Sequence, residues 1–168
     1  MTTLFISDLH LEDGRPESTA LFERFLQEEA TRADALYILG DLFEYWLGDD
    51  VNTETSQRVT RALSKLAARA IPCYFMHGNR DFLLGKRYAA QSGLQLLPDE
   101  KIIDLYGTPT LLMHGDSLCT DDVEYQELRR TIRRKDWKKQ FLSRSPDERR
   151  AMAEEGREQS REHQATLT

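Results

Sequence analysis

The chain has 168 residues, of which 39% are hydrophobic and 31% are charged, and its formal net charge is −6. This length suits one domain with one core, and the two cysteines, Cys73 and Cys119, are too few for a disulfide framework or a structural zinc site. No basic leader precedes the first apolar residues, and no apolar run approaches the roughly 20 residues that a membrane span needs. We therefore expect a cytoplasmic protein.

The charge is divided unevenly along the chain. Residues 1–120 carry a net charge of −7, and the residues after them carry +1. The stretch 148–162 is so rich in charge that it predicts a solvated helix or a disordered segment. We expect residues 1–122 to form the main domain and residues 123–168 to form a helical segment with a separate role.

The first part of the chain alternates between apolar strands and amphipathic helices. Runs rich in β-forming residues predict strands at 3–7, 35–39, 73–76 and 110–113. Helical spacing of apolar residues predicts one helix around Leu21 to Leu26 and a second around Val59 to Ala70. This order indicates an α/β fold with a largely parallel sheet and right-handed crossovers. Residues 102–106 and 110–113 predict a hairpin that would make the sheet mixed.

Each predicted strand is followed by side chains that can bind a metal ion. They are Asp8, His10, Asp41, Asn79 and His114. Ligand sites of open α/β sheets lie beyond the carboxyl ends of the strands, so we expect these side chains to converge at one edge. Each alone also fits a structural role, as a turn former, a cap or the end of a strand. Asp8 and His10 are two residues apart, and in an extended segment they would point the same way.

The residue types suit a centre with two divalent ions. Two ions roughly 3.5–4 Å apart can stabilise both the attacking and the leaving oxygen of phosphoryl transfer. We assign the bridging position to Asp41, one ion to Asp8 and His10, and the other ion to Asn79 and His114. Mixed oxygen and imidazole ligands suit Mn²⁺ or a similar first-row ion.

Four motifs in this chain resemble the motif series of the calcineurin-like metallophosphoesterases. They are Asp8-Leu9-His10, Gly40-Asp41, Gly78-Asn79-Arg80-Asp81 and His114-Gly115-Asp116. Over residues 3–125 the chain is similar to the subfamily of pyrophosphatases that act on UDP-2,3-diacylglucosamine in lipid A synthesis. The resemblance implies an αββα sandwich with a helical lid insertion. It also implies Mn²⁺-dependent hydrolysis that releases UMP and 2,3-diacylglucosamine 1-phosphate, or lipid X.

The resemblance also implies roles for individual residues. Asn79, Arg80 and His114 would be catalytic, with Arg80 neutralising the pyrophosphate. The substrate contacts would be Asn79, Arg80, Asp122 and Ser160. The family also carries a Gly-His-x-His motif after a further strand, and no such motif occurs in this sequence. On that ground we expect an incomplete, C-terminally truncated domain with weakened metal retention and little turnover by itself.

The beginning of the helical segment predicts a basic amphipathic helix. Its apolar residues are Tyr125, Leu128, Ile132, Trp137 and Phe141, and its basic residues are Arg129, Arg130, Arg133, Arg134, Lys138 and Lys139. Such a helix can lie on the cytoplasmic face of the inner membrane, or it can pack on the domain with its basic face solvated. The two readings are compatible with each other in an insertion that covers acyl chains. The acidic main domain argues against nucleic acid as a partner, and we expect a monomer.

Two alternative functions stay open. The same metals could serve a hydrolase of another nucleotide-diphosphate sugar or of a phosphodiester. In a different class, the chain could be a phosphoesterase-like scaffold that has lost catalysis and binds partners. Such scaffolds usually lose their ligands, whereas every ligand of the first part of the motif series is intact here: Asp8, His10, Asp41, Asn79 and His114. This favours an enzyme.

Overall fold

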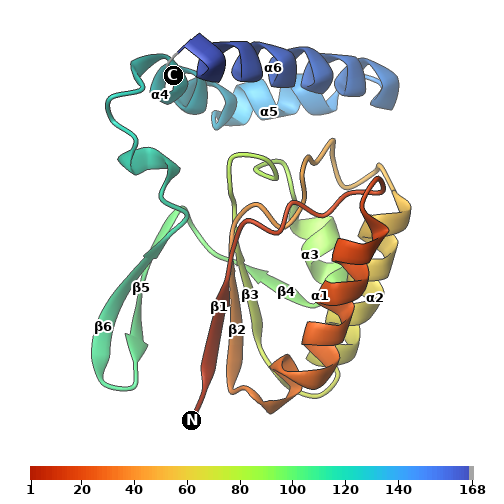
Figure 1. Ribbon diagram of the computed structural model, residues 1–168, viewed down its shortest axis with the longest axis vertical. Coiled ribbons are helices and arrows are strands. Elements are labelled where there is room, and N and C mark those ends of the chain that lie inside the picture. Colours follow the sequence, from red (N-terminus) through yellow and green to blue (C-terminus); the bar gives the residue numbers. More distant parts are fainter. Residues whose placement is uncertain (167–168) are drawn as a thin grey trace.

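A computed structural model describes residues 1–166, with their side chains up to residue 158, so the side chain of Ser160 lies outside the described residues. The predicted α/β fold is confirmed: a four-stranded parallel sheet in the order β1-β2-β3-β4 forms the centre (Figure 1). The strands are β1 (Thr3–Ile6), β2 (Ala35–Leu39), β3 (Cys73–Met76) and β4 (Leu94–Leu96). β4 is too short to give a pattern of its own, and the sequence did not predict it.

Three helices cover one face of this sheet (Figure 1). They are α1 (Pro16–Glu28), which a short 3₁₀ turn at Ala30–Arg32 follows, α2 (Glu54–Ala67) and α3 (Lys86–Ser92). α2 begins at a capping box in which Thr53 and Ser56 each accept a hydrogen bond from the backbone N–H of the other. Its buried Val59 and Leu63 join strand residues such as Ile38 and Phe75 in the core. Each such side chain contributes about 1.5–3 kcal/mol by burial.

The predicted hairpin forms, but the expectation of a mixed sheet is wrong. β5 (Glu100–Leu105) and β6 (Thr108–Met113) pair with each other in a separate antiparallel sheet. The parallel position beside β3 is taken by β4. The hairpin stands apart from the main sheet (Figure 1), and a hydrogen bond of 2.7 Å between the hydroxyls of Tyr106 and Thr3 connects them. Ile102 and Leu111, which are paired across the hairpin, are exposed.

Three further helices lie beyond the carboxyl ends of the parallel strands (Figure 1). A 3₁₀ turn at Asp116–Leu118 leads to α4 (Val123–Ile132), α5 (Lys135–Leu142) and α6 (Pro146–Thr166). The predicted single helix is thus divided in two, because Arg134 has extended backbone angles of −66° and 142°. Within the described residues, no helix has both the length and the apolar character needed to cross a membrane.

These helices also divide the apolar residues of the predicted amphipathic face. Leu128 on α4 is exposed, whereas Phe141 on α5 is buried. Trp137 stacks on Phe141 and lies against Phe82 of the main domain, with ring centroids 6.0 Å apart in the second pair. α5 therefore packs on the domain, as the second of the two readings predicted, but the basic face is not fully solvated, because Lys138 donates to the Phe82 carbonyl at 2.9 Å. The stretch 148–162 is helical, and its Arg149 is buried, so it is not solvated throughout.

Candidate metal centre

In the loops that follow β1 and β2, three residues have a left-handed backbone conformation, which residues other than glycine rarely adopt. Asp8, His10 and Asp41 have φ values of 57°, 49° and 53°. Such backbone strain is concentrated at functional sites in proteins. The prediction that Asp8 and His10 point the same way by strand alternation is therefore wrong in its cause, since left-handed turns direct both side chains toward Asp41.

Backbone hydrogen bonds hold the two loops side by side. The N–H groups of Asp8 and His10 donate to the carbonyls of Gly40 and Asp41 at 3.1 and 3.0 Å. A β-carbon on Gly40 would lie 2.6 Å from both the α-carbon of Gly78 and Nδ1 of His114. Only glycine permits this close approach. In the Gly-Asp motif, Gly40 is therefore needed for packing and Asp41 for binding a metal ion.

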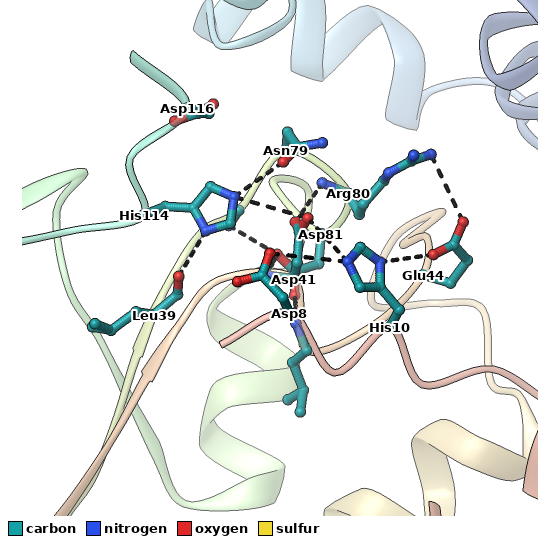
Figure 2. Close-up of polar contacts among 12 residues, drawn as sticks. Asp8, His10, Leu39, Asp41, Glu44, Asn79, Arg80, Asp81, His114 and Asp116 are labelled. Carbon is teal, nitrogen blue, oxygen red and sulfur yellow. Dashed lines mark hydrogen bonds and ion pairs between the residues drawn. The ribbon is translucent and has the colours of Figure 1, made fainter. Parts of the chain in front are cut away.

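Asp41 lies between two imidazole rings (Figure 2). Its Oδ2 is 3.7 Å from Nε2 of His10 and 3.8 Å from Nε2 of His114. Its Oδ1 accepts a hydrogen bond of 2.8 Å from the backbone N–H of Arg80. One ligand atom each from Asp8, His10 and Asp41 lie within 4.8 Å of one another. This arrangement suits a carboxylate that bridges two ions.

Hydrogen bonds on the far side of each ring determine which nitrogen faces the centre. Nδ1 of His114 lies 2.7 Å from the carbonyl oxygen of Leu39. A carbonyl only accepts, so Nδ1 donates this hydrogen bond, and Nε2 is the nitrogen that faces the centre. Nδ1 of His10 is likewise 2.7 Å from Oε2 of Glu44. Carboxylate and carbonyl partners of this kind orient histidines that bind metals.

The donor set fits a divalent cation. Nε2 of His114 lies 3.0 Å from Oδ1 of Asn79, so the two side chains reach the same point beside Asp41. Burial raises the pKa of Asp41, and the Arg80 N–H and the two imidazoles oppose that rise. The charge of Asp8 also disfavours a second negative charge on Asp41, and a cation between the two carboxylates removes this repulsion.

The structure brings the five predicted ligands and Arg80 together, but not every predicted site residue. Asp122 is the N-cap of α4, where Oδ1 accepts a hydrogen bond of 3.0 Å from the Tyr125 N–H. His77, which the sequence did not predict as a ligand, lies with Nε2 2.6 Å from the Leu84 carbonyl. Ser160 lies outside the described side chains.

Sequence reasoning missed two carboxylates that support the site. Glu44 contacts His10, and Asp81, which is fully buried, accepts hydrogen bonds from the backbone of the loop that contains Asp41. Asp81 belongs to a motif that was recognised, and its place three residues after Gly78 is typical of a turn-forming aspartate. No pattern in the sequence indicated the contact of Glu44.

The sequence signature described as calcineurin-like phosphoesterase matches residues 1–163 of the chain. The chain belongs to the calcineurin-like phosphoesterase family. A UDP-2,3-diacylglucosamine hydrolase of Stenotrophomonas maltophilia (strain K279a) is 54% identical over 167 residues, which are 99% of this chain and 67% of that protein. This phosphoesterase chain thus spans about two thirds of that relative's length.

Two further relatives carry the same name. The UDP-2,3-diacylglucosamine hydrolase of Yersinia enterocolitica is 55% identical over 84% of this chain and 59% of its own length. The one from Actinobacillus succinogenes is 56% identical over 79% of this chain and 56% of its own length. Membership of the calcineurin-like phosphoesterases implies hydrolase chemistry that depends on divalent metal ions. The cluster around Asp41 is the candidate place for those ions.

Proposed function

We propose that this phosphoesterase chain supplies the metal centre of a hydrolase that cleaves the pyrophosphate bond of UDP-2,3-diacylglucosamine. The products would be UMP and 2,3-diacylglucosamine 1-phosphate, a step of lipid A biosynthesis. The observation that carries the proposal is the position of the Asp41 carboxylate, 3.7 and 3.8 Å from the imidazoles of His10 and His114. The names of relatives that are 54–56% identical support the choice of substrate.

The metal ligands in this proposal are those that converge on Asp41. Asp8, His10 and Asp41 would hold one ion, and Asp41, Asn79 and His114 would hold the other. Their oxygen and imidazole donors suit Mn²⁺ or a similar first-row ion, and the resemblance to the Mn²⁺-dependent enzymes supports Mn²⁺. When bound, two such ions supply a nucleophile at neutral pH and neutralise the charge of the phosphoryl group.

The side chains around the ions orient the substrate. Arg80 follows the ligand Asn79, and its guanidinium lies 3.7 Å from Oε1 of Glu44, with its side chain 30% exposed. From this position it can pair with the pyrophosphate in two parallel hydrogen bonds. Asn79 faces the same space through its contact with His114. Asp122, at the N-cap of α4, and Ser160, in the helical segment, are proposed to contact the substrate.

We also propose that the protein lies on the cytoplasmic face of the inner membrane, where its acylated substrate is found. Val123 and Leu128 on α4 are 59% and 54% exposed. Arg130, Lys135 and Lys139 are exposed too, and they make no ion pair with any residue that the structure describes. Exposed apolar and basic groups on one segment favour an anionic lipid surface. Arg129 and Arg133 do not contribute, because both pair with Asp99.

The release of UMP from acylated and deacylated UDP-glucosamine, offered side by side, tests the proposed reaction. The protein is expressed from its full reading frame. We expect release that depends on Mn²⁺, stops with EDTA and is faster with the acylated compound. Asp41→Asn removes the bridge, and we expect it to lower kcat by about 100-fold or more. Equal rates with both compounds would favour a hydrolase of other nucleotide-diphosphate sugars. No release from either compound would favour a scaffold without catalysis.

A further inference from the structure

Glu44 connects three parts of the molecule through one carboxylate. It lies three residues after Asp41, and its side chain is 16% exposed. Its Oε2 is 2.7 Å from Nδ1 of His10, and its Oε1 accepts a hydrogen bond of 3.2 Å from Nη2 of Arg157. Arg80 lies 3.7 Å from the same Oε1. Figure 2 shows Glu44 beside His10, on the side of the ring away from Asp41.

The contact with His10 controls how that ring meets a metal ion. A carboxylate next to Nδ1 keeps the hydrogen on that nitrogen and directs Nε2 toward Asp8 and Asp41, at 3.9 and 3.7 Å. It also makes Nε2 a better donor to a cation. Any contact that holds Glu44 in place therefore holds His10 in its ligand geometry.

Arg157 brings the C-terminal helix α6 to this carboxylate. Its guanidinium also lies over the ring of Tyr45, 5.6 Å from the centroid. Eight residues earlier on α6, the buried Arg149 donates to the Leu47 carbonyl at 2.6 Å and to Asp50 at 2.8 Å. Residues eight apart share one face of a helix. α6 thus contacts the segment 44–50 at two points. At one of them, Arg157 donates to Glu44, whose other carboxylate oxygen contacts His10.

We propose that Glu44 is a positioning residue that couples the docking of α6 to metal binding at His10. The inference rests on the proposed metal centre. It explains how α6, which supplies none of the proposed metal ligands, can change the affinity of the centre for its ions. An anchored carboxylate needs no reordering when the ion binds, so docking strengthens metal binding. By linkage, metal binding strengthens docking by the same factor.

The test is a double-mutant cycle with Glu44→Gln and Arg157→Gln, in protein from the full reading frame. The dissociation constant for Mn²⁺ is measured from the electron paramagnetic resonance of free Mn²⁺. We expect Glu44→Gln to weaken binding about 10-fold or more and Arg157→Gln to weaken it about 5-fold. The double variant should bind no more weakly than Glu44→Gln alone.

Two further variants separate this coupling from a loss of charge or of fold. Arg150→Gln makes the same charge change on an exposed neighbour in α6, and it should leave Mn²⁺ binding unchanged. Arg157→Lys keeps a cation beside Glu44 and should restore most of the affinity. Hydrogen exchange provides the reciprocal measurement: Mn²⁺ should increase the protection of α6 about 5-fold in the natural protein and have no effect on it in Glu44→Gln.

The outcomes distinguish this inference from the proposed reaction. If Arg157→Gln binds Mn²⁺ as the natural protein does, or if the two losses simply add, the coupling is refuted even where UMP is still released. If the coupling is present and no UMP is released, the proposed reaction fails and the positioning role of Glu44 stands.

Discussion

Asp81 accepts a hydrogen bond of 3.2 Å from the backbone N–H of Asp41. The same carboxylate accepts hydrogen bonds from the N–H groups of Leu42 and Phe43, at 2.8 and 3.3 Å, and from Gly78 at 3.0 Å. One fully buried side chain therefore ties the loop after β2 to the loop after β3. The proposed bridging ligand depends on a second carboxylate that does not face the centre.

Asp81→Asn should destabilise the fold strongly. An amide group would turn its N–H toward two backbone donors that now point at a carboxylate oxygen, and those donors would be left unpaired. We expect the free energy of unfolding to fall by about 2–4 kcal/mol, measured by urea denaturation. Asp104→Asn is the control, because the exposed Asp104 accepts one hydrogen bond, from Gly107, through an oxygen that asparagine keeps. Similar losses in the two variants would contradict this role of Asp81.

Gly40→Ala should disrupt the candidate metal centre. Gly40 has a φ of 93°, and an added β-carbon would lie 2.6 Å from Nδ1 of His114. Gly107 has a φ of 90°, but nothing lies within 4 Å of its added β-carbon, so Gly107→Ala carries the backbone strain without the collision. We expect Gly107→Ala to cost about 1 kcal/mol and to retain Mn²⁺ binding. Gly40→Ala should lower the stability by more than this and lose Mn²⁺ binding, measured by titration calorimetry. Equal Mn²⁺ affinities in the two variants would refute the steric argument.

Arg149→Met should loosen the docking of α6. The change removes the hydrogen bonds that Arg149 donates to Asp50 and to the carbonyls of Leu47 and Arg144. Asp50 is 51% exposed, so water can hydrate its carboxylate when the arginine is gone. The expected loss of stability is about 2 kcal/mol, mostly from the unpaired carbonyls, with faster amide exchange in α6. The control is Arg144→Met, at an exposed position, for which we expect unchanged exchange.

The Asp50–Arg149 pair should also give a pH dependence of known sign. Hydrogen bonds from Arg149 hold the pKa of Asp50 below its ordinary value of 3.8. A carboxyl whose pKa is lowered by folding stabilises the folded state above the unfolded pKa, and this stabilisation is lost as pH falls through the folded pKa. The difference in stability between the natural protein and Asp50→Asn should therefore be constant above about pH 5 and shrink below pH 3.8. A difference that grows with acid would contradict the pairing.

Local patterns in the sequence were enough to predict the strands at β1 to β3 and the helices α1 and α2. They were also enough to predict which side chains follow those strands. This succeeded because the carboxyl ends of parallel strands lie at one edge, which places Asp8, Asp41 and Asn79 near one another before the left-handed loops direct the side chains. His114 was predicted to join them from a fourth strand of the same sheet. It does join them, but from the separate hairpin, through its hydrogen bond to the Leu39 carbonyl.

Contacts between segments far apart in the chain could not be predicted in this way. Examples are the pairing of β4, the break before α5 and the contacts of Glu44 and Arg157. They depend on which surfaces meet in the folded protein, and the spacing of residues along the chain does not indicate this. The motifs determined which residue types gather at the centre. The tertiary structure alone decided which nitrogen of His10 faces Asp41, because a carboxylate 34 residues away in the chain lies against the other one.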